Sequence, residues 1–123
     1  MKLRLEGNSI RLRVRKSDIN ALMKNEAITE ALTFPNGDVF QYKLTTNNTA
    51  LDIDAQLVSN VLTISLPRSI ATDWMQTDAV GIEKIVSNGL FILIEKDFPC
   101  TDRPWEDTRD TFFELVNEKE AIC

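Results

Sequence analysis

The sequence contains no histidine, and this absence removes the side chain used most often as a general base or as a metal ligand. Cysteine is scarce, and the two present, Cys100 and Cys123, are expected to be free thiols in a reducing compartment. The longest strongly apolar run, residues 89–94, is far shorter than the roughly 18–20 residues of a membrane span. The first residues lack the apolar core of a secretion signal. We therefore expect a cytoplasmic protein without a membrane segment, and a function that is more readily binding than catalysis.

The chain of 123 residues, 43% of them apolar, has the size and composition of one folded domain over residues 1–123. Its net charge of -5 hides an asymmetry between the two ends. Residues 1–16 are basic, and residues 97–123 are acidic. The basic side chains of the first segment are Lys2, Arg4, Arg11, Arg13, Arg15 and Lys16, against Glu6. One end of the protein is thus expected to attract anionic groups.

Residues 2–44 and residues 54–96 align without a gap. In this alignment Asn8 falls on Asn60, and Asn36-Gly37 falls on Asn88-Gly89. The same order of strand, turn, strand, short helix, strand, turn, strand is expected in both, as in a duplicated unit. We therefore predict a mainly β (α+β) domain with two β-β-α-β-β repeats. The predicted parts are repeat 1 (about 2–44), a linker (45–50), repeat 2 (about 51–96) and an acidic C-terminal tail (97–123).

Alternating residues around Gly7-Asn8 predict a first hairpin with an apolar inner face and a basic outer face. The expected cross-strand pairs are Leu5–Ile10 and Leu3–Leu12 inside, and Arg4–Arg11 and Lys2–Arg13 outside. Like charges directly across a ladder are destabilising, so something must compensate them. Water and salt, the chain's own carboxylates and an anionic ligand are all open alternatives.

Later segments carry local signals as well. Ser17 is expected to cap a short helix whose apolar face is Ile19, Leu22 and Met23. Asn36-Gly37 is expected to form a type I′ turn. Pro67 is expected where the second helix begins.

The run Phe91–Ile94 does not alternate, so we expect this strand to be covered on both faces. The tail is the expected cover, with a helix over Glu106–Glu120 and with Trp105 or Phe112 on the strand. Its acidic residues would then lie over the basic strands.

Three short motifs resemble the AbrB/MazE-like swapped-hairpin barrel: Gly7-Asn8-Ser9, Leu66-Pro67-Arg68 and Asp78-Ala79-Val80. Members of that family exchange hairpins as dimers to close one barrel, and many bind DNA. The resemblance implies a fused dimer: a monomer with a pseudo-two-fold closed β-barrel and a helical tail. Arg15-Lys16 departs from the proline of the family, and the second repeat lacks the basic residues, so symmetric reading of an operator is not implied.

Taken whole, the chain also resembles a family of small uncharacterised bacterial proteins, a domain of unknown function. The resemblance rests on residues 2–14, on Glu95-Lys96-Asp97-Phe98 and on Cys100. It implies no activity and no cofactor.

The candidate contact residues for nucleic acid or for an acidic protein partner are Lys2, Arg4, Arg11, Arg13 and Arg15. An alternative is a metal or small-molecule site, perhaps enzymatic, near Asp97, Cys100 and Asp102, although this set is poor for zinc. A third alternative is a purely structural domain whose tail covers the strands.

Overall fold

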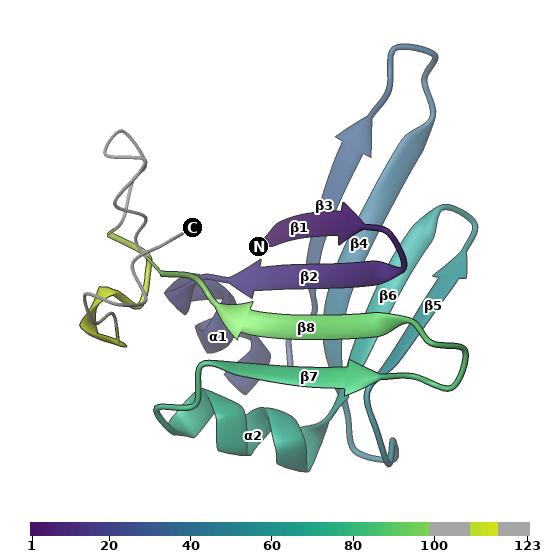
Figure 1. Ribbon diagram of the computed structural model, residues 1–123. Coiled ribbons are helices and arrows are strands. Elements are labelled where there is room, and N and C mark those ends of the chain that lie inside the picture. Colours follow the sequence, from purple (N-terminus) through teal and green to yellow (C-terminus); the bar gives the residue numbers. More distant parts are fainter. Residues whose placement is uncertain (99–108, 116–123) are drawn as a thin grey trace.

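The computed structural model describes residues 1–98 and 109–115 of the chain. Strands dominate these residues, with two short α-helices and one 3-10 turn (Figure 1). The elements are β1 (Lys2–Glu6), β2 (Ser9–Val14), α1 (Lys16–Met23), β3 (Ile28–Thr33), β4 (Val39–Asn47), β5 (Asp54–Val58), β6 (Val61–Pro67), α2 (Arg68–Gln76), β7 (Gly81–Ile85), β8 (Phe91–Lys96) and η1 (Phe113–Leu115). The prediction of a mainly β protein with short helices is confirmed.

The strands form two four-stranded sheets, sheet A with the order β1-β2-β8-β7 and sheet B with the order β3-β4-β6-β5. Each sheet combines one hairpin from the first half of the chain with one hairpin from the second (Figure 1). The hairpins are antiparallel, and the two central pairings, β2 with β8 and β4 with β6, are parallel. Long-range pairing between the halves therefore builds both sheets.

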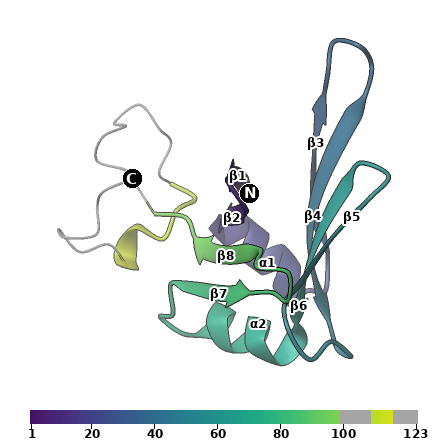
Figure 2. The ribbon, with the colours of Figure 1, turned by 45° about the vertical axis from the view of Figure 1, so that its right-hand side comes forward.

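The two sheets do not join into a closed barrel, which corrects the expectation drawn from the sequence. Each sheet keeps two edge strands, β1 and β7 in sheet A and β3 and β5 in sheet B. A barrel has no edges, because its first and last strands pair. Here the β3–β4 hairpin extends past sheet A (Figure 2).

Two hairpins turn tightly, as the sequence predicts. In the first, Leu5 pairs with Ile10 and Arg4 with Arg11, and Gly7 has a positive φ of 53°. In the corresponding β5–β6 hairpin, Ser59 and Asn60 both have positive φ, of 50° and 65°. Positive φ at both loop residues is the type I′ pattern, while a single one at the first loop residue is the type II′ pattern.

The two Asn-Gly loops differ from the expected type I′ turn. Only the glycines have positive φ there, 92° at Gly37 and 89° at Gly89. The Phe34 amide donates to the Asp38 carbonyl at 2.8 Å, and the Val86 amide donates to the Leu90 carbonyl at 2.9 Å. Three residues thus lie between the bonded positions, with glycine at the left-handed position of a longer hairpin loop.

Helix α1 begins two residues earlier than it would with Ser17 as its N-cap. Arg15 is the N-cap, and its amide donates to the Asp18 carboxylate at 2.8 Å. Ile19 and Leu22 are buried as predicted, but Met23 is 44% exposed and does not fill the core. This two-turn helix therefore buries two of the three apolar residues on its predicted apolar face.

One apolar core unites the sheets and helices. Leu12 and Ile94 of sheet A, Leu44 and Ile64 of sheet B, and Trp74 of α2 are all buried in it. None of the helices in the described part of the chain is long and apolar enough to cross a membrane.

Candidate functional site

The outer face of sheet A brings most of the predicted basic residues together. In the strand register, Arg13 lies between Lys2 and Glu95, and Arg11 lies between Arg4 and Leu93. β1 and β2 supply the cations because their alternation points every second side chain outward. β8 supplies Glu95 from 82 residues further along the chain than Arg13.

Glu95 is the carboxylate that compensates two arginines of β2. These are Arg11, which faces Arg4 across the ladder, and Arg13, two residues further along the strand. One oxygen of the Glu95 side chain, Oε1, accepts from Arg11 Nε at 2.6 Å and from Arg13 Nε at 2.8 Å. The side chains of Glu95, Arg11 and Arg13 are 11%, 31% and 20% exposed. A carboxylate that is shared between two guanidinium groups leaves one positive charge uncompensated at this point of the sheet.

Gly81 lies opposite Glu95 on β7, where the two strands are closely packed. A Cβ at this position would lie 3.3 Å from Glu95 Cβ and 3.1 Å from the Ile94 carbonyl oxygen. The glycine therefore admits the close packing around the Glu95 backbone.

Arg4 is the most accessible of the three hairpin arginines on this face, since Arg11 and Arg13 are 31% and 20% exposed. It pairs with Glu6 at 3.3 Å, and both side chains are largely exposed, at 63% and 75%. Exposed pairs of this kind hold their partners weakly. A hollow of about 210 Å³ adjoins the pair, lined by Arg4, Glu6, Ser9, Ile10, Arg11, Phe91 and Leu93.

Lys2 belongs to the same face but has a buried partner. Its Nζ lies 3.2 Å from Oδ2 of Asp97, whose side chain is 1% exposed. The pair sits beside Lys96, whose Nζ donates to the Thr77 carbonyl at 2.7 Å. Burial lowers the pKa of the Lys96 ammonium below its ordinary 10.5, against the opposing effect of the Asp78 and Glu114 charges.

Arg15 does not join this face, because it lies between β2 and α1 as the N-cap of the helix. Of the three predicted metal candidates, the structure describes Asp97 alone. Asp97 pairs with Lys2, and Cys100 and Asp102 lie outside the described residues. Residues 1–98 and 109–115 contain no group of three side chains suited to a metal ion.

The described piece of the tail, residues 109–115, contacts α1 and the end of β8. The Asp110 carboxylate accepts from the Ser17 amide at 3.0 Å and from the Ser17 hydroxyl at 2.6 Å. Glu114 pairs with Lys16 at 3.1 Å. Phe112 lies at the end of β8, where the Lys96 ammonium is 5.4 Å from its ring. Trp105 lies outside the described residues, as does most of the expected helix over Glu106–Glu120. Within residues 109–115, the structure has the short 3-10 turn η1 in place of an α-helix.

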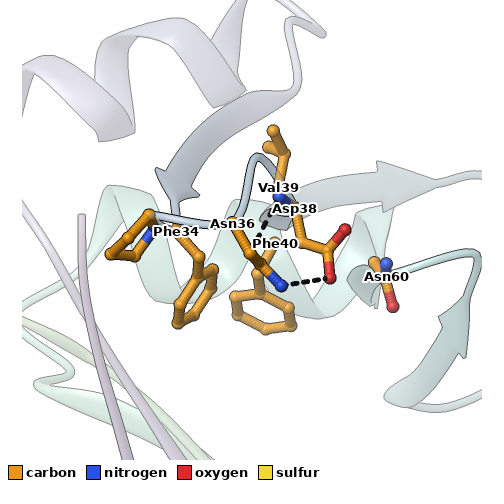
Figure 3. A pocket seen from close by; sticks show the side chains of 7 residues that line it. Phe34, Asn36, Asp38, Val39, Phe40 and Asn60 are labelled. Atoms are coloured by element: carbon orange, nitrogen blue, oxygen red, sulfur yellow. Dashed lines mark hydrogen bonds between the residues drawn. The ribbon is translucent and has the colours of Figure 1, made fainter.

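Apolar hollows lie at the ends of the hairpins, and the alternating sequence pattern does not predict them. The larger has a volume of about 540 Å³ and lies between the β3–β4 loop and Asn60 of the β5–β6 turn (Figure 3). Phe34 and Phe40 form its apolar wall, and Asn36 hydrogen-bonds to Asp38 at 3.1 Å on its rim. A second hollow of about 280 Å³ lies between the sheets. Its lining is Leu5, Ile10, Phe40, Ala55, Gln56, Leu57, Leu62 and Leu90.

Leu5 and Leu57 are 60% and 67% exposed because the sheets diverge at this end. The sequence does contain a signal for this hollow, since the pair Leu5–Ile10 of the first repeat corresponds to the pair Leu57–Leu62 of the second. Such hollows can accept apolar groups, but strand alternation alone places these residues in a core.

The sheet B strands also hold a polar cluster. Glu30 on β3 lies opposite Tyr42 on β4, and its carboxylate is 3.5 Å from the Met1 amino group. Burial raises the pKa of the Tyr42 hydroxyl to about 12, and the hydrogen bond and negative charge of Glu30 add to this effect. The cluster is structural in character, since each group compensates another.

Among curated proteins and among solved structures, the comparisons found no match to the chain. A family model does match, over residues 1–114, and it covers both sheets and the outer face of sheet A. This confirms the whole-chain resemblance inferred from the sequence. The chain belongs to the Family of unknown function (DUF7009).

Proposed function

We propose that the protein is a non-enzymatic binding module, and that the outer face of the β1–β2 hairpin contacts an acidic protein partner. The observation that carries the proposal is the single Glu95 oxygen shared by Arg11 and Arg13. The shared carboxylate fixes both guanidinium groups and leaves a surplus positive charge. Arg4, whose ion pair with Glu6 is exposed, adds a second cation at the rim of the hollow.

An acidic protein fits this face better than a nucleic acid does. Glu95 lies among the arginines, and Glu83 lies on the same face, across β8 at Leu93. Charges of both signs at short spacing oppose a continuous phosphate backbone, which needs a uniformly basic track. The sequence pI of about 4.7 also opposes nonspecific nucleic-acid binding. The carboxylates of a protein partner can instead be spaced between these charges.

The test is a fluorescence anisotropy titration with a labelled peptide rich in Asp and Glu, and with a labelled DNA duplex. The peptide should bind in a salt-sensitive manner, and the duplex should not bind. Arg4→Ala with Arg11→Ala should weaken peptide binding about tenfold, the effect of losing one charge-assisted contact. The matched control is Lys24→Ala with Lys43→Ala, which changes the net charge equally away from sheet A.

Absence of peptide binding, or equal weakening by the control pair, would contradict the acidic-partner proposal. Binding of the duplex with similar affinity would favour the nucleic-acid version. The cytoplasmic location expected from the sequence stays a prediction.

We further propose that the two halves are copies of one unit, arranged as in a fused swapped-hairpin dimer. The hairpin registers support this, because Leu5–Ile10 corresponds to Leu57–Leu62, and Thr29–Lys43 corresponds to Gly81–Glu95. The parallel pairings differ. Ile10 pairs with Ile92, whereas Leu62 pairs with Tyr42, which is two residues beyond the position corresponding to Ile92. This slip gives the two sheets different relative positions of their hairpins.

A further inference from the structure

The four edge strands differ in how they are protected against pairing with another chain. In sheet A, β1 carries Lys2, Arg4 and Glu6, and β7 carries Glu83 and Lys84. Charged side chains on an edge discourage strand addition. Strand β3 of sheet B, with the sequence ITEALT, carries Glu30 alone. The Glu30 carboxylate is turned to the Met1 amino group and to Tyr42, so it does not guard the edge.

The edge of β3 presents backbone groups in a regular pattern. The Phe34 amide donates to Asp38, on the β4 side of the hairpin. In an antiparallel ladder, alternate residues point their N–H and C=O groups to the same side. Leu32, Glu30 and Ile28 therefore pair inward with β4, and Thr29, Ala31 and Thr33 present their backbone groups outward.

The sequence of this edge is complementary to itself. About Ala31 as a centre, Thr29 falls opposite Thr33, and the flanking Ile28 falls opposite Phe34. The remaining pair is Glu30 with Leu32, so no like charges meet. Thr–Thr and apolar pairs across antiparallel strands are stabilising, and a two-fold contact requires this self-complementarity.

We propose that a second copy of this chain pairs with the β3 edge, antiparallel, about a two-fold axis at Ala31. The paired β3 strands would join two copies of sheet B into one continuous sheet. The β3–β4 hairpin extends beyond the body, which leaves room for the second copy (Figures 1 and 2).

Apolar exposure on the same hairpin supports this occupant. Leu32 is 49% exposed and Phe34 is 48% exposed. In the pair, Leu32 would lie beside Glu30 of the second copy, and Phe34 beside its Ile28, so each copy covers the other's apolar side chains. The resemblance to a fused barrel implies a monomer, and pairing at the β3 edge would make a dimer instead. It does not depend on the acidic-partner site, which lies on sheet A.

A symmetric disulfide tests the register. Residues directly opposite in a hydrogen-bonded antiparallel pair have Cα atoms about 5.5 Å apart, within disulfide range. In a Cys100→Ser, Cys123→Ser background, Ala31→Cys should therefore form a covalent dimer upon mild oxidation. Thr29→Cys is the matched control. Its two copies would be about 13 Å apart, four residues out of register, so it should not crosslink.

Sedimentation equilibrium tests the association without a covalent bond. The wild type should reach twice its chain mass of 14.0 kDa with rising concentration. Ala31→Lys should raise the dimer dissociation constant about tenfold or more, because two ammonium groups would meet at the axis. Gln56→Lys, on the other edge of sheet B, should leave this constant unchanged.

Three results would overturn the proposal: a wild type that stays monomeric at every concentration, equal crosslinking of Ala31→Cys and Thr29→Cys, or a dimer weakened by Gln56→Lys and unaffected by Ala31→Lys. Circular dichroism of each variant separates loss of pairing from loss of folding.

Discussion

At the scale of single residues, Glu95 shows how a facing pair of arginines is tolerated. Arg4 and Arg11 are directly opposite, as the hairpin pattern predicts. The position of a compensating carboxylate could not be predicted, because Glu95 reaches β2 only through a parallel pairing between distant parts of the chain. Three alternatives were open from the sequence, and the geometry favours the chain's own acids, with β8 as their source.

Removing this carboxylate should destabilise the fold. Glu95→Gln leaves Arg11 and Arg13, neighbours on the outer face of β2, without the negative charge between them, and should lower the free energy of unfolding by about 1–2 kcal/mol. Urea denaturation followed by circular dichroism measures the change. Glu6→Gln is the control, since its pair with Arg4 is exposed and should contribute almost nothing. Equal effects of the two substitutions would show that burial of Glu95 adds no stability.

Tyr42 is the single tyrosine of the chain, so its ionisation can be followed by absorbance alone. The folded protein should titrate with a midpoint near 12, against about 10 in urea. Glu30→Gln should lower the folded midpoint, because it removes the carboxylate that disfavours the phenolate. The folded state keeps the proton to higher pH than the unfolded state does. Stability should therefore fall as the pH rises from 10 to about 12.

At the scale of elements, local patterns predicted most strands and both helices. Alternation identified the hairpins, and Pro67 closes β6 as the N-cap of α2. The predicted boundaries of an element are wrong where tertiary contacts extend that element. The expected linker over residues 45–50 is partly strand, since β4 continues to Asn47 by pairing with β6. No local signal marks that extension.

The end of α1 shows a similar long-range contribution. Arg68 donates to the Leu22 carbonyl at 2.8 Å and to the Met23 carbonyl at 3.1 Å. The Leu22 carbonyl also accepts from the Asn25 amide at 3.0 Å, and the guanidinium group complements the negative end of the helix dipole. The start of α1 is satisfied by Asp110 from across the chain. The contacts of Arg68 and Asp110 come from distant parts of the chain, whereas Asp18, which accepts from the Arg15 amide at 2.8 Å, is a local contribution to the start of the helix.

Asp110→Ala should therefore loosen residues 109–115 from α1. The loss of a carboxylate that accepts at a helix N-terminus costs about 1 kcal/mol. Hydrogen exchange should show faster exchange at the Ser17 amide, with little change in β3 and β4. Protection of the Ser17 amide at the wild-type level in this variant would mean that Asp110 is not its partner in solution.

At the scale of the whole molecule, the strand order makes each half dependent on the other. β2 pairs with β8, and β4 pairs with β6, so neither sheet has its central pairing within one half. Closure into a barrel was predicted from resemblance and did not occur. Closure depends on the register in which the hairpins pair, and short motifs do not determine that register.

Cutting the chain between Asn48 and Thr49 tests this dependence. Each half alone should be largely unfolded, because a single hairpin cannot bury its apolar face. Mixing the halves should restore the circular dichroism spectrum of the intact protein, at a rate that depends on concentration. If the first half folded on its own, this would contradict the dependence of each sheet on one hairpin from each half of the chain.

Sheet A is proposed to bind acidic groups through arginines whose charge Glu95 partly neutralises. The most direct measurement is the affinity of one acidic peptide for three proteins at one salt concentration: Glu95→Gln, the wild type, and Arg4→Ala with Arg11→Ala. We expect the tightest binding for Glu95→Gln, because its guanidinium groups lose their competing internal carboxylate, and the weakest for the double arginine variant. Equal affinities for all three proteins would contradict it.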